Sequence, residues 1–442
     1  MLGNMKVIVA GAGLAGLMTA RDLEARGAQV TVIEARDRVG GRVHTIRDGF
    51  VAGQHAEAGA DLIESEQSLV LDLARELDLK PMRILRRGWG FYGPDKRGKL
   101  RIRNAPDAFE EGARRLQPEI TDYTLAGRRW DSPITSAIAR QSVRDWLTRI
   151  NADAGFSAAM TGLRGFFLAD PDDLSLIALV DEFASGETPA DSRMFRIADG
   201  NDRLATEMSR RLRGNVTLNA AVRRVVQDNS EVRVTVHDGQ QREVIADYAV
   251  LALPASTLRD VQFEPALHAD QSRAFASLRY GAATRVLLQF ATRYWRRPGR
   301  PSAYGTDQAT GAVWDANEQQ SMRPGILTLL AGGGAASEIR CILEDGVAAL
   351  LSRLEWLGRP SMLLQHRVIG WDLDPWARGG YAYFDPAFDP HLRAWLMRPS
   401  KRVVFAGEHT SDRWQGYMNG ALESGRRAAA EVRALDAMSA LR

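Results

Sequence analysis

Two mainly apolar stretches separated by a helical pattern open the chain. Residues 5–10 form the first, which is interrupted only by Lys6, and residues 29–33 form the second, which also contains Gln29 and Thr31. Between them, apolar side chains recur at positions 14, 17, 18 and 23, which is the spacing of a helix. A run without polar alternation is typical of a parallel strand that is buried on both faces. The beginning of the chain therefore predicts a strand, a helix and a second, parallel strand.

Later patterns divide the chain into strand-rich and helical stretches. The region from about residue 104 to residue 181 has helical spacing, in which residues 156–168 predict one apolar helix. An amphipathic helix is predicted over residues 69–79, and another follows residue 195 and ends at Leu212. Short alternating runs predict antiparallel strands, and longer apolar runs predict buried strands, at residues 216–218, 222–227, 231–237, 241–245, 248–253, 281–290 and 403–406.

The segment between the first strand and the first helix is rich in glycine. Its sequence, residues 11–16, is Gly-Ala-Gly-Leu-Ala-Gly. Gly11 allows a tight turn, Gly13 lets a pyrophosphate approach the backbone, and Gly16 lets the helix pack closely on the strand. Together with the strand and the helix, these glycines form a dinucleotide-binding fingerprint.

The ends of the elements beside this turn supply the remaining parts of the fingerprint. The N–H groups at the helix start, where Leu14 and Ala15 lie, are free to bind phosphate, and the helix dipole favours its negative charge. The second strand ends on Glu34, whose carboxylate can accept hydrogen bonds from a ribose diol. We therefore expect a dinucleotide with its pyrophosphate at the helix start.

The residues after Glu34 indicate which dinucleotide is bound. Ala35 and Arg36 lead into a second glycine pair, Gly40 and Gly41, which is followed by Arg42. A second glycine turn flanked by arginines supplies further anion contacts beside the first. This stretch resembles the second FAD signature of the flavin amine oxidase superfamily, which includes monoamine oxidases, polyamine oxidases and L-amino-acid oxidases. The resemblance implies FAD as the cofactor.

The C-terminal part carries the strongest resemblance. Residues 403–410, Val-Val-Phe-Ala-Gly-Glu-His-Thr, and residues 414–425, which begin Trp-Gln-Gly-Tyr-Met, are similar to the C-terminal motif of monoamine oxidases. The resemblance implies that Tyr417 is one wall of an aromatic cage. It also implies that the helix beginning near Tyr417 points its N-terminus, with the Met418 N–H, at the flavin. The cofactor contacts that it implies here are Gly407, Glu408, Gly416, Tyr417 and Met418.

Further segments match the family in their order along the chain. The resemblance implies that Gly59, Ala60 and Asp61 pass the flavin, that Val222 contacts the adenine and that Trp371 packs near the flavin. Tyr381 stands where monoamine oxidases carry their flavin-linked cysteine, so we expect non-covalent FAD and a second aromatic at the reacting face. The expected pocket-lining residues are Leu62, Phe384 and Trp414.

Arg285 is a departure from the family. Many amine oxidases carry a lysine on the corresponding strand, where it holds a water against the flavin and assists the reaction with oxygen. A guanidinium is longer, stays charged and donates as a planar fork. We consider three roles for Arg285 at this catalytic position: it holds the same water, it binds a substrate anion, or it pairs with a carboxylate.

The resemblance covers nearly the whole chain and implies an α/β fold. A Rossmann-like FAD-binding domain of the amine oxidase type (GR2) is interleaved with an α+β substrate-binding domain. We expect the FAD-binding domain to be discontinuous, at residues 1–80, 196–279 and 370–442. The substrate-binding domain takes residues 81–195 and 280–369.

The function that these matches imply is oxidation of an amine. A hydride equivalent leaves the α-carbon for flavin N5, water hydrolyses the imine to a carbonyl compound plus ammonia or a smaller amine, and O2 or another acceptor reoxidises the flavin, O2 giving H2O2. The first alternative is an L-amino-acid oxidase. Those enzymes clamp the substrate carboxylate with an arginine at the position of Leu62, which argues for an amine, although Arg285 could replace that clamp. Lesser alternatives are a flavin desaturase or protoporphyrinogen-oxidase-like enzyme, and a non-catalytic FAD-binding redox sensor.

Composition narrows the partners and the compartment. The chain has 442 residues, a net charge of +3 and one cysteine, Cys341, so intramolecular disulfides and cysteine-rich metal sites are excluded. We expect no metal, and no nucleic-acid partner because no basic stretch is interleaved with aromatic residues. No apolar run reaches the length of about 20 residues that a membrane helix needs, so we expect no membrane association and no C-terminal anchor of the kind found in membrane-bound monoamine oxidases. We expect a cytoplasmic enzyme and consider a homodimer as its assembly.

Overall fold

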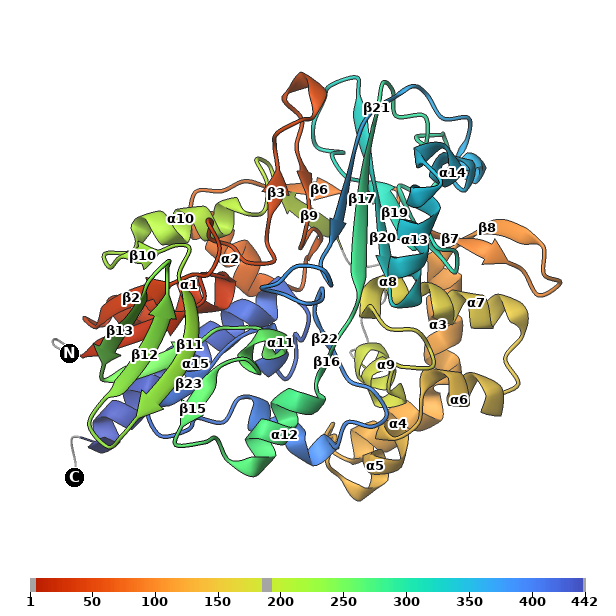
Figure 1. Ribbon diagram of the computed structural model, residues 1–442. Coiled ribbons are helices and arrows are strands. Elements are labelled where there is room, and N and C mark those ends of the chain that lie inside the picture. The colour runs from red at the N-terminus through yellow and green to blue at the C-terminus, as the bar shows by residue number, and fades with distance from the viewer. Residues whose placement is uncertain (1–4, 185–192, 440–442) are drawn as a thin grey trace.

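The two largest sheets lie at opposite ends of the molecule. The computed structural model of the chain describes residues 5–184 and 193–439. In Figure 1 the parallel sheet with its helices lies on the left, and a seven-stranded sheet and a helical segment lie on the right. The chain passes between the two ends several times, so that each end is built from separated segments.

Five parallel strands form the sheet that carries the first glycine turn. Strand β1 is central, and the order is β10, β2, β1, β14, β23. Val7 and Val9 pack with the helices on one face, whereas Ile8 and Ala10 pack with the neighbouring antiparallel sheet on the other. The elements are β1 (Lys6–Ala10), β2 (Gln29–Ile33), β10 (Val216–Thr217), β14 (Tyr248–Leu251) and β23 (Val403–Phe405), with helices α1 (Leu14–Glu24), α10 (Arg203–Arg211) and α15 (Met418–Ser439).

The antiparallel sheet on the other face corrects one prediction. The predicted strand at residues 216–218 does not join the antiparallel strands, because β10 pairs in parallel with the edge of β2. Two residues are too few for their own polarity pattern to specify a partner, and this pairing satisfies backbone groups at the sheet edge. The antiparallel strands are β11 (Ala221–Gln227), β12 (Val232–His237) and β13 (Gln241–Ala246), and β15 (Gln262–Glu264) pairs in parallel with β11.

The seven-stranded sheet is organised around β17, in which every residue is buried. Its neighbours β20 and β21 are both antiparallel to it, and helix α13 packs against β17 and β20. The strand order is β21 (Leu363–Gly370), β17 (Ala283–Phe290), β20 (Gly325–Gly332), β19 (Ala312–Asp315), β18 (Ala303–Thr306), β7 (Trp89–Pro94) and β8 (Leu100–Asn104). The following helices are α13 (Gly334–Glu344) and α14 (Val347–Ser352).

The helical segment differs from its prediction in one place. Residues 156–168 do not form one helix, because α7 (Ala154–Gly162) ends and α8 (Arg164–Phe167) begins around Leu163. Leu163 keeps helical backbone angles, but its N–H bonds to the Met160 carbonyl (3.2 Å) in 3-10 fashion, next to Gly162, where a Cβ would lie 2.7 Å from the Phe91 ring. The other helices are α3 (Ala105–Arg115), α4 (Gln117–Leu125), α5 (Pro133–Ala139), α6 (Val143–Arg149) and α9 (Leu176–Phe183).

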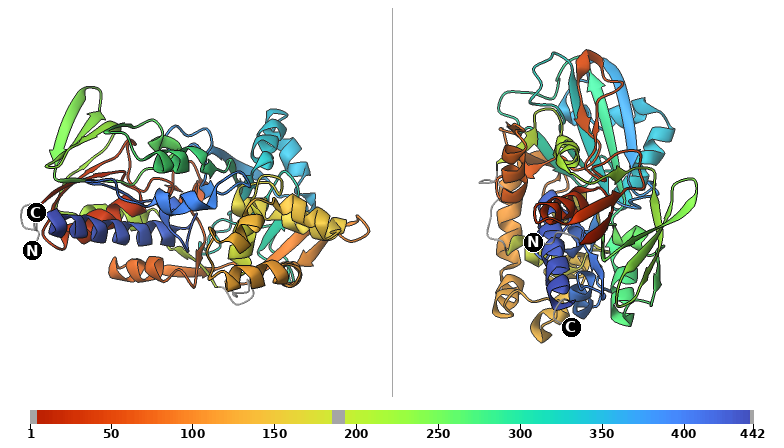
Figure 2. Two further views of the ribbon diagram at one scale, coloured as in Figure 1. Left: turned by 90° about the horizontal axis from the view of Figure 1, so that it is seen from below. Right: turned by 90° about the vertical axis from the view of Figure 1, so that its left-hand side faces the viewer.

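Small sheets and short helices connect these parts (Figure 2). Helix α2 ends at Glu76, earlier than predicted, because the chain turns through a left-handed Asp78. The domain boundaries drawn from the sequence stay a prediction. The connecting elements are α2 (Ser68–Glu76), α11 (Ala255–Leu258), α12 (Ala269–Ser277), β3 (Thr45–Ile46), β4 (Ala56–Glu57), β5 (Ile63–Glu64), β6 (Pro81–Ile84), β9 (Met194–Ile197), β16 (Arg279–Tyr280) and β22 (Ala382–Tyr383), with 3-10 helices at Val51–Gly53, Glu355–Leu357, Pro390–Leu396 and Glu408–Thr410.

Candidate active site

The start of α1 forms one end of a long cavity. Gly11 has a φ of 101°, and a Cβ on Gly16 would lie 1.9 Å from the Gly11 carbonyl oxygen, so both positions require glycine. Gly16 supports this packing and, unlike the other predicted cofactor residues, does not line the cavity. At Gly13 a Cβ would meet nothing within 4 Å, and no side chain caps the helix. The helix N-terminus therefore opens onto free space.

Glu34 and Arg36 lie at this end with their partners in place. Glu34 accepts hydrogen bonds from the N–H groups of Ala12 (2.7 Å) and Arg36 (2.9 Å). Burial raises the pKa of Glu34, and these hydrogen bonds partly oppose the rise. The Arg36 guanidinium forms a two-pronged pair with Asp374, with both distances 2.7 Å. The carboxylate predicted for the ribose is thus held rigidly beside the cavity.

The second glycine turn lies directly beside the first. Gly40 donates its N–H to the Ala12 carbonyl (2.8 Å), and a Cβ on Gly41 would lie 3.5 Å from the Gly13 Cα. Gly41 has a φ of 58°. Because both turns line the same stretch of the cavity, the two motifs found in the sequence belong to one site.

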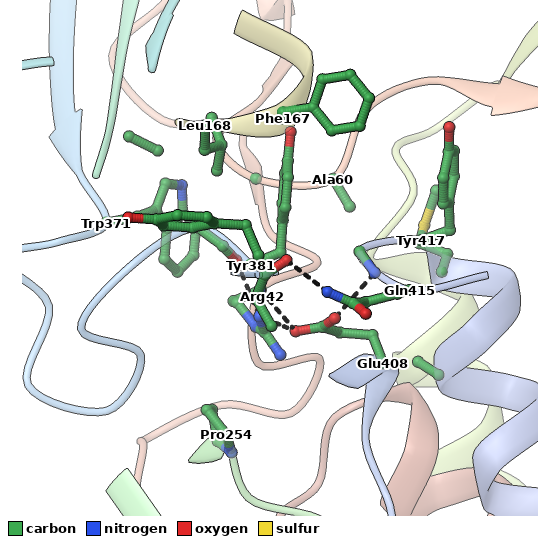
Figure 3. A pocket seen from close by; sticks show the side chains of 18 of the residues that line it. Arg42, Ala60, Phe167, Leu168, Pro254, Trp371, Tyr381, Glu408, Gln415 and Tyr417 are labelled. Atoms are coloured by element: carbon green, nitrogen blue, oxygen red, sulfur yellow. Dashed lines mark hydrogen bonds and ion pairs between the residues drawn. The ribbon is translucent and has the colours of Figure 1, made fainter. Parts of the chain in front are cut away.

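Glu408 joins three segments at the base of the pocket (Figure 3). It accepts hydrogen bonds from the Arg42 guanidinium and from the Gly416 N–H, each at 2.9 Å. Arg42 also donates to the carbonyl of Gly380 at 2.9 Å. Burial opposes the charge on Arg42, but Glu408 and Tyr280 outweigh it and raise the pKa of Arg42. These contacts tie the second glycine turn to the segment between β23 and α15, where Gly407, after the strand, and Met418, at the helix start, also line the cavity.

Tyr381 and Tyr417 line the cavity beside this carboxylate. Tyr417 rises from the start of α15 toward the side on which Phe167 lies (Figure 3). Trp414 stands edge-to-face against Tyr417, with ring centroids 5.5 Å apart. The Tyr381 hydroxyl donates to the Phe166 carbonyl, and burial raises the pKa of Tyr381. Aromatic rings therefore surround the space next to Glu408.

Position 59 requires a glycine because two other chain segments pack closely against it. A Cβ there would lie 1.8 Å from the Arg42 carbonyl oxygen and 3.0 Å from the Trp371 ring. The Trp371 indole donates to the Ala58 carbonyl (2.8 Å), which fixes the ring against this segment. Ala35, Ala60, Val222 and Trp371 all line the cavity, as the resemblance implies.

The cavity continues into an aromatic chamber between the two ends of the molecule. The whole cavity, from the glycine turns to this chamber, has a volume of about 870 Å³, and Leu62, Phe384 and Trp414 are among the residues that line it. The sequence did not single out several other wall residues, because aromatic side chains in helices and strands usually belong to a core. These are Trp89, Phe91, Phe109, Trp130, Phe166, Phe167, Trp314 and Tyr383.

Arg285 pairs with a carboxylate, which is one of the three roles considered from the sequence. Its guanidinium donates to Asp61 Oδ2 (3.0 Å) and to the Glu57 carbonyl (3.1 Å), and it stacks over the Trp314 ring at 5.1 Å. Arg196, which is fully buried, binds the other oxygen of Asp61 at 2.6 Å. Arg196 was not predicted from the sequence, because its neighbours along the chain do not mark a buried cation.

Two further buried titratable groups, Glu57 and His409, lie near the site. Burial, followed by the charge of Asp61, raises the pKa of Glu57 to about 8. Burial lowers the pKa of His409 to about 4, and neither ring nitrogen has a hydrogen-bond partner, so this residue is a neutral part of the packing. Within residues 5–184 and 193–439, no cluster of His, Cys, Asp or Glu could hold a metal ion.

These residues fit FAD. The open space above Gly13 and the uncapped helix suit a pyrophosphate, and Glu34 suits a ribose. The same cavity is also lined by Val222, by Gly407 and by the residues of the aromatic chamber. One continuous cavity thus joins a dinucleotide site to a chamber for a second molecule.

Comparison with known families decides the assignment. A model described as flavin containing amine oxidoreductase matches residues 14–433. The chain belongs to this family. As a flavin amine oxidoreductase, the protein uses FAD to oxidise an amine, and the α/β fold predicted from the sequence is confirmed.

Individual relatives support the same family. The oxidoreductase is 29% identical over 450 residues to a Mycobacterium tuberculosis protein provisionally named flavin-containing monoamine oxidase AofH, covering 98% of this chain and 97% of the relative. It is 28% identical over 477 residues to the flavin-dependent L-tryptophan oxidase RebO of Lentzea aerocolonigenes, with 98% of each chain covered. The solved structure of cyclohexylamine oxidase from Brevibacterium oxydans has a TM-score of 0.85 at 22% identity, covering 98% of this chain and 99% of the other.

Among the helices that the structure describes, none is both long and apolar enough to cross a membrane.

Proposed function

We propose that the two glycine turns, Glu34 and the start of α15 hold FAD without a covalent bond. The open N-terminus of α1 and the contacts of Glu408 support this placement. Residue 381 is a tyrosine, and the single cysteine, Cys341, is exposed on α13 and does not line the cavity. Trichloroacetic acid precipitation should release all of the flavin into the supernatant.

We propose that the substrate is an amine without an α-carboxylate, which enters between Tyr381 and Tyr417. The observation that carries this proposal is the pairing of Arg285. This buried arginine of the chamber wall donates from Nη1 to Asp61 and to the Glu57 carbonyl, so its charge is already compensated within the protein. The aromatic walls exclude water, which disfavours the charged ammonium and favours the neutral, reactive amine. When bound, FAD accepts the hydride equivalent from the α-carbon.

An L-amino-acid oxidase is the second candidate. Arg285 does line the chamber, and the similarity to an L-tryptophan oxidase is nearly as high as that to the named monoamine oxidase. Under this reading, Arg285 would bind the substrate carboxylate through nitrogens other than Nη1, which contacts Asp61 and the Glu57 carbonyl.

Anaerobic bleaching of the flavin absorbance distinguishes the two candidates. The purified holoenzyme is mixed with 2-phenylethylamine, benzylamine, cyclohexylamine, putrescine and, separately, L-phenylalanine and L-tryptophan. Bleaching by an amine but by neither amino acid is expected. Bleaching by the amino acids alone would overturn the proposal. Readmission of air tests O2 as the acceptor, since rapid return of colour with H2O2 formation is the oxidase result. The homodimer and the cytoplasmic location stay predictions.

A further inference from the structure

Asp61 collects three donors from three separate elements. The Arg196 Nε on β9 lies 2.6 Å from Oδ1, whereas the Arg285 guanidinium on β17 (3.0 Å) and the Trp314 indole N–H on β19 (2.8 Å) share Oδ2. Asp61 is 5% exposed and follows the Gly59 and Ala60 segment that lines the cavity. One carboxylate therefore fixes a cation and an aromatic ring from distant parts of the chain.

Two of these donors form part of the chamber wall. Arg285 and Trp314 line the cavity, whereas Arg196 does not and is completely buried behind them. The Arg285 guanidinium lies over the Trp314 ring at 5.1 Å, so both groups depend on one anchor for their positions. A change in the charge of Asp61 would consequently be felt at the chamber surface through Arg285.

Asp61 also provides the negative charge nearest to the two arginines. Glu57 does not replace it as a direct partner, because the Glu57 carboxyl group accepts its hydrogen bonds from the Thr45 hydroxyl (2.8 Å) and the Asn201 N–H (2.9 Å). Burial and Asp61 raise the pKa of Glu57, which keeps that group largely protonated near neutral pH. Without the charge of Asp61, the chamber wall would gain positive charge at Arg285, which repels an ammonium and attracts a carboxylate.

We propose that Asp61 is the positioning residue that sets the preference for amines. It holds Arg285 in a charge-compensated form and Trp314 in a fixed orientation, so that the chamber accepts an amine and rejects its α-carboxylated counterpart. This inference rests on the proposed function and extends it by assigning the origin of the specificity.

The chain contains a matched control for this carboxylate. Asp315, which is 1% exposed, likewise binds two arginines and one tryptophan: Arg293 (2.8 Å), Arg296 (2.8 Å) and the Trp295 indole (3.1 Å). It does not line the cavity. Asp315→Asn therefore makes the same chemical change in the same kind of buried cluster, away from the chamber.

The test compares holoenzyme variants with three related probes. 2-Phenylethylamine carries only the amine, 3-phenylpropionate carries only the carboxylate, and L-phenylalanine carries both. We expect Asp61→Asn to bind 3-phenylpropionate about tenfold more tightly than the wild type, measured as a shift of the flavin spectrum. The ratio of kcat/KM for 2-phenylethylamine to that for L-phenylalanine should fall by about the same factor. Asp315→Asn should lower the thermal midpoint and leave both quantities unchanged.

Two further variants keep the test decisive. The double variant Asp61→Asn with Arg285→Met should bind 3-phenylpropionate as weakly as the wild type, because it lacks the uncompensated positive charge of Arg285. Arg285→Met alone should keep the preference for the amine, since Asp61 remains paired with Arg196, and it serves if Asp61→Asn does not retain flavin. Three results would overturn the inference. They are loss of the amine preference in Arg285→Met, unchanged or undetectable binding of 3-phenylpropionate in Asp61→Asn, and equal effects of Asp61→Asn and Asp315→Asn. Failure of the proposed function is separate, since it would appear as absence of wild-type bleaching by every amine.

Discussion

Replacement of Glu57 by glutamine should remove a large pH dependence of stability. Glu57 is completely buried, and its carboxyl group is bound by the Thr45 hydroxyl (2.8 Å) and the Asn201 N–H (2.9 Å). Burial and the neighbouring Asp61 raise its pKa from 4.5 to about 8. A glutamine side chain has the shape of the protonated acid: its oxygen can accept from Asn201 and its NH2 can donate to the Thr45 oxygen.

Proton linkage gives the sign and the size of the pH dependence of stability that Glu57 causes. Between pH 4.5 and about 8 the native protein keeps a proton on Glu57 that the unfolded chain has lost, so wild-type stability falls as pH rises through this window. At about 1.4 kcal/mol for each pH unit, the full window corresponds to a loss of about 5 kcal/mol. Glu57→Gln should therefore equal the wild type near pH 5 and exceed it by about 4 kcal/mol at pH 8.5.

The measurement is the difference in the free energy of unfolding between the wild-type and Glu57→Gln holoenzymes at each pH. His409 acts in the opposite direction, because its pKa is lowered from 6.5 to about 4 and its neutral form gains stability as pH rises through that range. Comparison at equal pH cancels this contribution. Denaturant midpoints from tryptophan fluorescence at pH 5, 6.5 and 8.5 are suitable, with exposed Glu344→Gln as the control. Equal pH slopes for the wild type and Glu57→Gln would refute the reasoning.

Three further predictions concern the cofactor and the aromatic walls. Gly13→Asp places a carboxylate in the open space at the start of α1, so the variant should fold but purify without flavin absorbance; full flavin content would contradict the assignment of the phosphate site. Glu408→Gln leaves the Arg42 charge uncompensated and should cost about 3 kcal/mol in the free energy of unfolding, measured by denaturant titration. Tyr417→Leu should keep its flavin but reduce the rate of anaerobic bleaching by up to about tenfold, whereas Tyr417→Phe should stay near the wild-type rate; equal rates for all three proteins would exclude Tyr417 from the cage.

The buried clusters around Asp61 and Asp315 explain why effects on specificity and effects on stability can be separated. Asp61 and Asp315 each bind two arginines and an indole, yet only Asp61 reaches the cavity. Buried pairs of this kind add little net stability, because desolvation of the charges offsets their attraction, but removal of one partner is costly. Specificity and stability can therefore be measured at different members of one structural type.

Local features of the active site were readable from the sequence alone. The turn at residues 11–16, the acid at Glu34 and the start of α15 are set by consecutive residues whose conformational needs are visible in the chain. Gly11 needs a positive φ, and the apolar residues 7–10 of β1 need cover on both faces. Because these requirements concern neighbours along the chain, their prediction did not depend on the rest of the fold.

Only the tertiary structure decided which distant groups meet. The strand at Val216 takes a sheet edge as its partner and the break near Leu163 lies beside the Phe91 ring, and both neighbours are far away in sequence. Asp61 and Trp314 are separated by 253 positions, so neither residue marks the other in the chain. The pairing that commits Arg285 exists because β17, β19 and the Gly59 segment converge on one buried point, where a charge without a partner would be too costly to remain.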